Sequence, residues 1–168
     1  MEKKVALIPK VIMKGAMGPK QYGVLLTDQR AIFVLEKASK AAVLGALGDA
    51  LLGDKKEVDY KNENLDGLAA DDKNVVVPYS GIQKLHLKKG FSSYTMSNAY
   101  TLLVDFMDPT NTPRSIKAFL QPPEELVKNK KAEGVDRKAV TEEYARNARK
   151  AFEQAMPPVA SQRGEWDV

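Results

Sequence analysis

Three groups of residues have types that could support catalysis, but their patterns do not match an active site. His86 could act as a general base, yet no serine or acid accompanies it in a recognisable motif. Asp71 and Asp72 could act as paired carboxylates, but adjacent acids in a polar segment point apart and lack the burial that tunes such pairs. The stretch Gly48–Lys55 approaches a phosphate-binding loop, but its lysine is displaced by one position and no serine or threonine follows. We therefore predict no enzymatic activity and no catalytic residues.

The composition argues against metal and cofactor chemistry. The 168 residues include no cysteine and one histidine, which leaves no disulfide, thiolate zinc site, iron–sulfur cluster or multi-histidine metal site. We predict no metal, no cofactor and no small-molecule substrate. No apolar run approaches the roughly 20 residues of a membrane-spanning helix, and Pro9 and Lys10 interrupt the first stretch before a signal-peptide core could form. We expect a cytoplasmic protein that can lie at the membrane periphery.

Basic residues are the best candidates for a binding site. Lys84, His86 and Lys88 alternate with leucines, so a strand here would carry a basic stripe on one side, with Lys89 at its end. Other lysines surround an expected turn that contains Gly15, Gly18 and Pro19. The candidate anion-binding residues are Lys14, Lys20, Lys84, His86 and Lys88, and Lys10 also lies near the turn. The alternative is that these side chains only solvate the surface.

The charges are distributed unevenly along the chain. The formal net charge is +4, which by itself indicates neither nucleic acid nor a membrane as partner, and nucleic acid is not expected. Residues 1–40 carry a net +5, residues 49–72 a net −5 and residues 73–121 a net +4. If the acidic segment is an insertion, the basic body that it interrupts can concentrate anionic partners within about a Debye length.

Residues 41–52 provide a second candidate surface. Their apolar positions recur at helical spacing, which predicts a short amphipathic helix that ends at Gly53. Gly45 and Gly48 weaken such a helix but allow close approach of another backbone. The helix could contact a second subunit, fold back as a lid, or touch a membrane, through Val43, Leu44, Leu47 and Leu51. Residues 54–73 are acidic and polar, and we expect a long mobile loop there.

Alternating and β-branched segments predict about seven strands that would position these residues. Pro9 indicates an edge strand or a bulge, and Asp28 and Gln29 have the length of a tight hairpin connection. Gly81 should break or bend a strand, and Gly90 should end one. The strands are expected within residues 5–13, 22–27, 30–37, 75–79, 85–89, 100–106 and 116–120.

Two helices are expected after the strands. The first begins near Pro122 and Pro123 and ends at Gly134. The second has Thr141 as its candidate cap and stops before Pro157 and Pro158. From Ala160 onward we expect a frayed tail, in which Trp166 makes a loose surface contact. The apolar face of the second helix consists of Val140, Tyr144, Ala148, Phe152 and Ala155.

Two local motifs resemble the bacterial and archaeal pleckstrin-homology-like (PH-like) domain family. Gly23–Phe33, with Thr-Asp-x-Arg between two apolar strands, resembles the signature hairpin of that family, and Val76–Ile82 resembles its next element. The similarity covers about residues 1–130, and members of the family also carry insertions near residues 38–53. It implies a mainly β, partly open barrel of about seven antiparallel strands with a C-terminal amphipathic helix and a short inserted helix. Residues 1–133 would form the domain, with an insertion at 38–73, and residues 134–168 a helical extension and tail.

The resemblance also implies where a ligand would bind. Lipid-reading members of the wider superfamily use basic residues around the first hairpin loop, where Lys14 and Lys20 lie here. Thr27 to Arg30 are interpreted first as hairpin residues that bond local partners, with a ligand-binding role for Arg30 as the alternative. We predict a non-enzymatic module for protein–protein docking or self-assembly. The alternative is peripheral binding to anionic lipid headgroups, and a hydrolase would rest on His86 alone.

Overall fold

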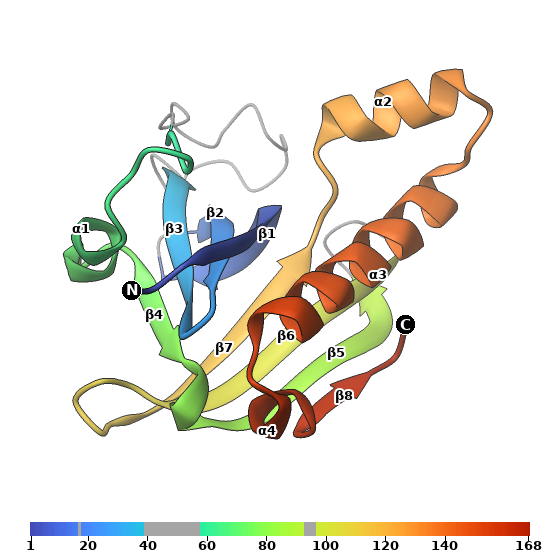
Figure 1. Ribbon diagram of the computed structural model, residues 1–168. Coiled ribbons are helices and arrows are strands. Elements are labelled where there is room, and N and C mark those ends of the chain that lie inside the picture. Colours follow the sequence, from blue (N-terminus) through green and yellow to red (C-terminus); the bar gives the residue numbers. More distant parts are fainter. Residues whose placement is uncertain (17, 39–57, 93–96) are drawn as a thin grey trace.

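Eight strands form the framework of the computed structural model, which describes residues 1–16, 18–38, 58–92 and 97–168 (Figure 1). Within these residues the strands make one open sheet in the order β4-β3-β2-β1-β7-β6-β5-β8. Neighbouring strands are antiparallel except β5 and β8, which are parallel. The fold is mainly β, as predicted. The strands are β1 (Lys4–Gly15), β2 (Gly18–Thr27), β3 (Arg30–Ala38), β4 (Val75–Pro78), β5 (Ile82–Ser92), β6 (Ser97–Met107), β7 (Pro113–Leu120) and β8 (Gly164–Trp166).

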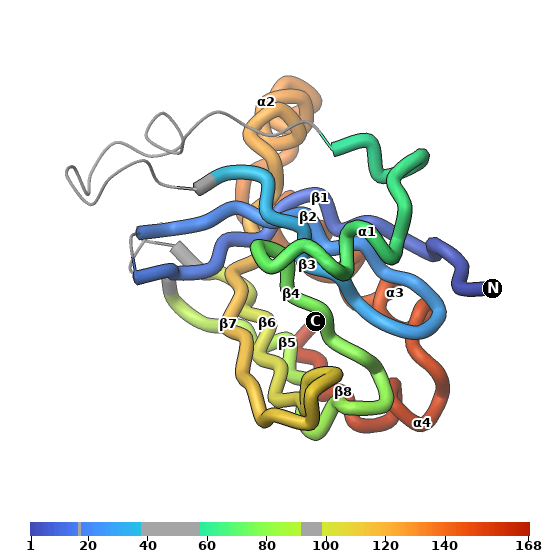
Figure 2. The backbone as a smooth tube through the Cα atoms, turned by 90° about the vertical axis from the view of Figure 1, so that its left-hand side faces the viewer, coloured from blue at the N-terminus to red at the C-terminus, as the bar shows by residue number. Residues whose placement is uncertain are grey.

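The sheet bends so that its two halves cross, with β1 to β4 on one side and β5 to β8 on the other (Figure 2). β1 joins the halves, because it pairs with β2 along its length and with β7 through Val11, Ile12 and Met13. β4 and β8 remain at the edges, so the sheet is not closed. The register of β1 against β2 shifts between Ile8 and Val11, which confirms the bulge expected at Pro9.

The main core lies between the two halves and is built by alternation. Along the central parts of β5, β6 and β7 every second residue points inward and is buried. The inward residues are Leu85, Leu87, Tyr100, Leu102, Val104, Phe106, Ile116, Ala118 and Leu120. The alternating strand predicted over residues 100–106 is therefore confirmed, as is the strand ending at Leu120. The prediction that this strand ends at Gly90 is wrong. β5 continues to Ser92 because it stays paired with β6 over that length.

β2 and β3 are covered on both faces, as their near-continuous apolar sequence predicts. Leu25, Ile32 and Val34 form a second cluster with Leu68, apart from the main core. Leu68 belongs to helix α1 (Leu65–Ala70), which lies beside β3 and β4 (Figure 1). The expectation of a loop throughout residues 54–73 is therefore wrong for this helix, which forms because Asn64 caps its first amides and Leu68 finds an apolar face to cover.

Two longer helices follow β7. α2 (Glu124–Ala132) stands away from the strands (Figure 1) and ends at Gly134, whose positive φ of 83° closes the helix as predicted. α3 (Arg137–Ala155) buries its predicted apolar face, and Tyr144, Ala148, Phe152 and Ala155 of that face belong to the main core. Its cap is Asp136, whose carboxylate accepts the Ala139 amide at 2.7 Å. The assignment of Thr141 as cap is wrong, because its hydroxyl lies within the helix and donates to the Arg137 carbonyl.

The segment after α3 is folded, contrary to the expected frayed tail. It forms helix α4 (Pro158–Ser161) and then β8, which lies along β5. Trp166 is half-buried and packs against the main core, as does Val168. The prediction of a loose contact was wrong because the sequence does not reveal that the edge of β5 is available to the tail.

The predicted helix over residues 41–52 lies outside the described residues. A short 3₁₀ turn, η2 (Tyr79–Gly81), separates β4 from β5 where a break at Gly81 was expected. Among the described helices, none has the length and apolar character to cross a membrane.

Candidate anion-binding site

A hollow of about 450 Å³ opens where the β1–β2 hairpin leaves β7. Beyond Met13 the hairpin no longer pairs with β7, so the hairpin and β7 diverge. Side chains from both line the space between them. β4 and β6 contribute Val75 and Phe106. The full lining is Met13, Lys14, Gly15, Lys20, Tyr22, Val75, Phe106, Arg114, Ser115, Ile116, Lys117 and Phe119.

Four lining residues are cationic and none is acidic. Lys14 and Lys20 were predicted from the sequence, and the structure places Arg114 and Lys117 with them. Neither Lys14 nor Lys20 forms an ion pair with a described residue. Cationic side chains without nearby counter-charges produce a positive potential, which low-dielectric walls concentrate in a concave space. The hollow is therefore suited to an anionic group.

The position of Lys20 depends on Gly15. A Cβ atom at position 15 would lie 3.0 Å from Cε and 3.4 Å from Cδ of Lys20, and 3.1 Å from the Gly18 carbonyl oxygen. The lysine side chain thus crosses the hairpin over the glycine. Both residues line the hollow, so a side chain at position 15 would have to displace the Lys20 side chain there.

The turn between β6 and β7 lies next to Arg114, which lines the hollow. The Asp108 carboxylate accepts hydrogen bonds from the Thr110 amide at 2.9 Å, the Thr110 hydroxyl at 2.7 Å and the Thr112 amide at 2.9 Å. These bonds, led by the Thr110 hydroxyl, lower the pKa of Asp108. The closest approach of Arg114 Nη1 to the carboxylate is 3.6 Å. The Asp108 carboxylate is thus bonded mainly to turn residues. The N–H groups of the Arg114 guanidinium therefore remain able to donate to another anion.

The predicted basic stripe lies on the outer face of β5, separate from the lining of the hollow. Lys84 and Lys88 are exposed, whereas the His86 side chain is 17% exposed. His86 Nε2 lies 3.1 Å from Asp167 Oδ1, and Nδ1 lies 3.5 Å from Glu165 Oε2. Two carboxylates therefore lie at the centre of the predicted basic stripe. Among the described residues no hydroxyl group hydrogen-bonds to the ring.

Lys10 does not belong to the hollow. It is buried, at the bulge of β1, because the bulge alters the alternation that would otherwise place it with the turn lysines. Sequence reasoning missed Arg114 and Lys117. The available signal was the inward alternation of Ile116, Ala118 and Leu120, which places Lys117 on the opposite face of β7. The pairing of β7 with β1 was the missing information.

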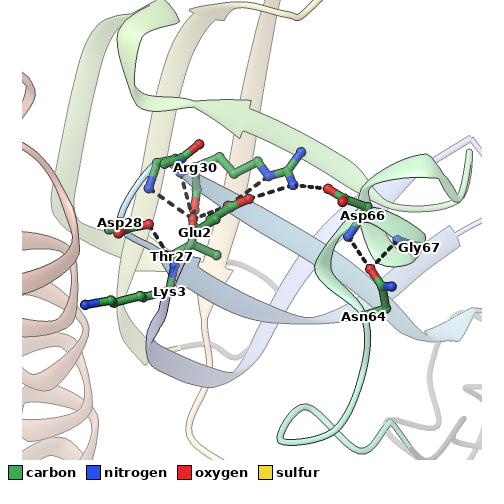
Figure 3. A network of polar contacts seen from close by, with 9 residues as sticks. Glu2, Lys3, Thr27, Asp28, Arg30, Asn64, Asp66 and Gly67 are labelled. Atoms are coloured by element: carbon green, nitrogen blue, oxygen red, sulfur yellow. Dashed lines mark hydrogen bonds and ion pairs between the residues drawn. The ribbon is translucent and has the colours of Figure 1, made fainter.

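The hairpin residues Thr27 and Arg30 form a structural network (Figure 3). Arg30 binds Glu2 through Nε at 3.0 Å and Nη2 at 2.8 Å, and its Nη2 also lies 3.1 Å from Asp66 of α1. The Thr27 hydroxyl donates to Glu2 at 2.6 Å and accepts the Arg30 amide at 2.9 Å. Both residues thus bond local partners, as the first interpretation predicts, and Arg30 ties the N-terminal residues to α1.

The apolar positions of the second candidate surface, Val43, Leu44, Leu47 and Leu51, lie outside the described residues. Within the described part of the chain no group of three or more histidine and acidic side chains is arranged to hold a metal ion. No protein-family model matches the chain, and no curated protein or solved structure is significantly similar to it.

Proposed function

We propose that the chain is a non-enzymatic PH-like interaction module that binds an anionic group in the hollow between the β1–β2 hairpin and β7. The observation that carries this proposal is the meeting of Lys14, Lys20, Arg114 and Lys117 around one space whose lining holds no acidic side chain. The PH-like assignment is supported by the antiparallel run β4-β3-β2-β1-β7-β6-β5 and by the amphipathic helix that packs on it.

Anionic lipid headgroups are the ligands that we favour. Each lysine near an anionic membrane surface contributes about 1 kcal/mol, so the cations of the hollow would give weak, salt-sensitive attachment. Met13 and Phe119 also line the hollow and offer apolar contact beside the charges. A free phosphate presents the same chemistry, so the experiment must separate the two sources.

The test is co-sedimentation with phosphatidylcholine vesicles, with and without phosphatidylserine, at low and high salt. We expect binding to the anionic vesicles alone, which falls as salt rises. Lys20→Ala and Lys117→Ala should each weaken binding about fivefold, as loss of about 1 kcal/mol requires. The matched control is Lys138→Ala, because this exposed lysine of α3 lies outside the hollow, and it should bind like the wild type.

Three outcomes would contradict the proposal or part of it. Equal sedimentation with neutral and anionic vesicles would show that the protein does not recognise anionic lipid. If Lys138→Ala weakened vesicle binding as much as Lys20→Ala does, the hollow would not be the binding site. Calorimetric binding of inorganic phosphate by the wild type but not by Lys20→Ala, without vesicle binding, would assign the hollow to a soluble anion instead.

Self-assembly through residues 41–52 is a separate prediction, since those residues lie outside the described part of the chain. Size-exclusion chromatography with light scattering tests it. A monomer that is unchanged by deletion of residues 41–53 would contradict it.

A further inference from the structure

The hollow between the β1–β2 hairpin and β7 reaches the main core of the protein. Tyr22, Phe106 and Ile116 line the hollow and are also buried members of that core. Met13 and Val75 line it too, and both are partly buried against the same core. These side chains come from both halves of the sheet. The inner wall of the hollow is therefore mainly apolar, in contrast to its cationic residues.

Two of the cations lie at core-facing positions of their strands. Successive side chains of a strand alternate between the two faces of a sheet, so Lys20 shares the face of Tyr22 and of the core residue Val24. Arg114 likewise shares the face of Ile116. Along each of these faces an apolar residue is followed by a cationic one where the core ends. An anion bound at Lys20 and Arg114 would therefore lie next to the apolar wall.

The hollow is larger than an anionic group alone requires. Its volume is about 450 Å³, which is within the range of about 300–1,000 Å³ for pockets that hold small molecules. A water molecule takes about 30 Å³ of liquid, and a phosphate ion is only a few times larger, so it would leave most of the space to water. A hydrocarbon group in that space would gain the free energy of burial against the apolar wall.

The hollow offers few hydrogen bonds to a polar ligand. Among the described lining residues, the polar uncharged side chains are those of Tyr22 and Ser115. The Ser115 hydroxyl already donates to Asp105 at 2.6 Å. A sugar or a nucleobase needs several placed donors and acceptors for its orientation, whereas a hydrocarbon chain needs none. The lining therefore favours a chain as the part of the ligand that follows the anionic group.

We propose that the hollow binds an anionic amphiphile with a single hydrocarbon chain. Its phosphate or carboxylate lies at Lys20 and Arg114, and its chain lies along Tyr22, Val75 and Ile116, between the two halves of the sheet. The inference rests on the anion recognition proposed above and adds that the chain of the ligand contributes to affinity. A free amphiphile and a single-chain lipid of a membrane present the same chemistry.

The experiment is calorimetric titration of the full chain with ethyl, butyl, hexyl and octyl phosphate, each below its micelle concentration. The anionic group is the same in all four ligands, so differences in affinity report the chain. Full burial of one methylene corresponds to about a fourfold gain in affinity. We expect the affinity to rise about two- to fourfold for each methylene from ethyl to octyl phosphate.

Two substitutions separate the anionic group from the chain. Lys20→Ala should weaken all four phosphates about fivefold and leave the dependence on chain length unchanged, because it removes one cation. Val75→Phe adds bulk to the inner wall, so it should weaken octyl phosphate about tenfold and leave ethyl phosphate unchanged. The matched controls are Lys138→Ala and Val159→Phe, at exposed positions outside the hollow. Both should bind all four ligands like the wild type.

Met13→Ala provides a second test of the chain site if Val75→Phe does not fold. It removes a partly buried side chain of β1 from the wall without adding bulk. Octyl phosphate should bind this variant about fivefold more weakly, whereas the affinity for ethyl phosphate should stay at the wild-type value.

Vesicles that contain a single-chain anionic lipid distinguish the two sources of the amphiphile. Phosphatidylcholine vesicles with lysophosphatidate are sedimented in the presence of the protein. Protein that sediments with the vesicles binds the lipid at the membrane, whereas protein that stays in the supernatant with lysophosphatidate bound carries the lipid in solution. Either result supports the proposal, and protein that does neither contradicts it.

The failure of this inference differs from the failure of the proposed function. Equal affinity for ethyl and octyl phosphate, with both weakened by Lys20→Ala, would overturn the inference and keep the anion site. Absence of binding by all four phosphates, or binding that Lys20→Ala does not weaken, would contradict anion recognition in the hollow itself. A dependence on chain length that Val75→Phe and Met13→Ala both leave unchanged would place the chain outside the hollow and overturn the inference.

Discussion

The hydroxyl of Tyr144 accepts a hydrogen bond from the Lys10 amide and donates one to the Lys10 carbonyl, each at 2.8 Å. Both residues are buried. The register of β1 against β2 shifts between Ile8 and Val11, so the bulge cannot use a regular ladder for these two groups. One side chain of α3 therefore satisfies both backbone groups and fixes the helix on the sheet.

We expect Tyr144→Phe to lower the free energy of unfolding by about 1 to 3 kcal/mol, because it removes two hydrogen bonds to the buried backbone of Lys10. The phenyl ring keeps the packing of α3, so the loss reports the hydroxyl. Urea denaturation followed by circular dichroism measures it. A midpoint within error of the wild type would show that the bulge finds other partners.

Tyr79→Phe is the matched control for that substitution. Tyr79 is 1% exposed, and its hydroxyl has no hydrogen-bond partner among the described residues. Removing it costs no hydrogen bond and relieves an unsatisfied buried group, so stability should stay constant or rise by about 1 kcal/mol. If both variants lost equal stability, hydroxyl bonding would not be the cause at Tyr144.

Much of the fold could be predicted because its signals are local. Alternation over Tyr100 to Phe106 and the Asp28-Gln29 turn each depend on neighbouring residues. The parallel β8 depends on a free edge of β5 that is distant in the sequence, and Trp166 followed no periodic pattern. Neighbouring residues therefore predict neither β8 nor the packing of Trp166. The helix cap at Asp136 is visible in the local sequence, and the prediction of Thr141 as the cap placed it five residues too late.

The candidate site was predictable only in the part carried by one hairpin. Lys14 and Lys20 flank a turn that glycines mark in the sequence, so their proximity follows from the hairpin alone. Arg114 and Lys117 join them because β7 pairs with β1, a contact between residues about a hundred positions apart. Glu165 and Asp167 reach His86 through the same kind of distant pairing, and they turn an apparent basic stripe into a mixed one.

The protein should lose stability in alkaline solution from about pH 10 upward. Burial, followed by the hydrogen bond to Glu36, raises the pKa of Tyr60 well above its ordinary value of 10. Burial also raises the pKa values of Tyr79 and Tyr144. A raised folded-state pKa gives stability that is present below the unfolded pKa and lost as pH rises toward the folded value.

Tyr60→Phe tests this alkaline loss. The Tyr60 hydroxyl donates to Glu36 at 2.5 Å, so the variant is less stable at neutral pH. Its further loss of stability between about pH 9 and pH 11 should be smaller than that of the wild type, because one of the shifted groups is gone. Urea midpoints at several pH values measure the slope. An unchanged slope would show that Tyr60 ionises with its ordinary pKa in the folded protein.

The tail should detach in acid before the rest of the fold opens. The hydrogen bond with His86, followed by that from the Lys89 amide, lowers the pKa of Asp167. A lowered pKa gives stability that is present above the ordinary carboxyl range and lost as pH falls toward the folded value. Trp166 is the one tryptophan in the chain and packs against the main core, so its fluorescence reports the packing of the tail while circular dichroism reports the sheet.

Asp167→Asn should reduce the acid dependence of the fluorescence, since an amide does not titrate, while Glu165 and His86 remain at the tail. Asp105→Asn is the matched control, because this carboxylate accepts a hydrogen bond from Ser115 on the outer face of the sheet and does not contact the tail. It should keep the wild-type fluorescence profile. If Asp167→Asn kept that profile too, another group would hold the tail.

Gly81 ends the turn η2 just before β5, and Gly90 lies within β5, but the two glycines differ in what surrounds them. A Cβ atom at Gly81 would lie 2.3 Å from the carbonyl oxygen of Met107, whereas one at Gly90 would have nothing within 4 Å. The Met107 oxygen belongs to the backbone at the end of β6 and cannot move as a side chain does. Gly81→Ala should therefore cost about 1 to 3 kcal/mol, while Gly90→Ala should be neutral or stabilise by up to about 1 kcal/mol. Thermal unfolding of both variants measures the difference, and equal melting temperatures would mean that β5 and β6 can separate at Gly81 without cost.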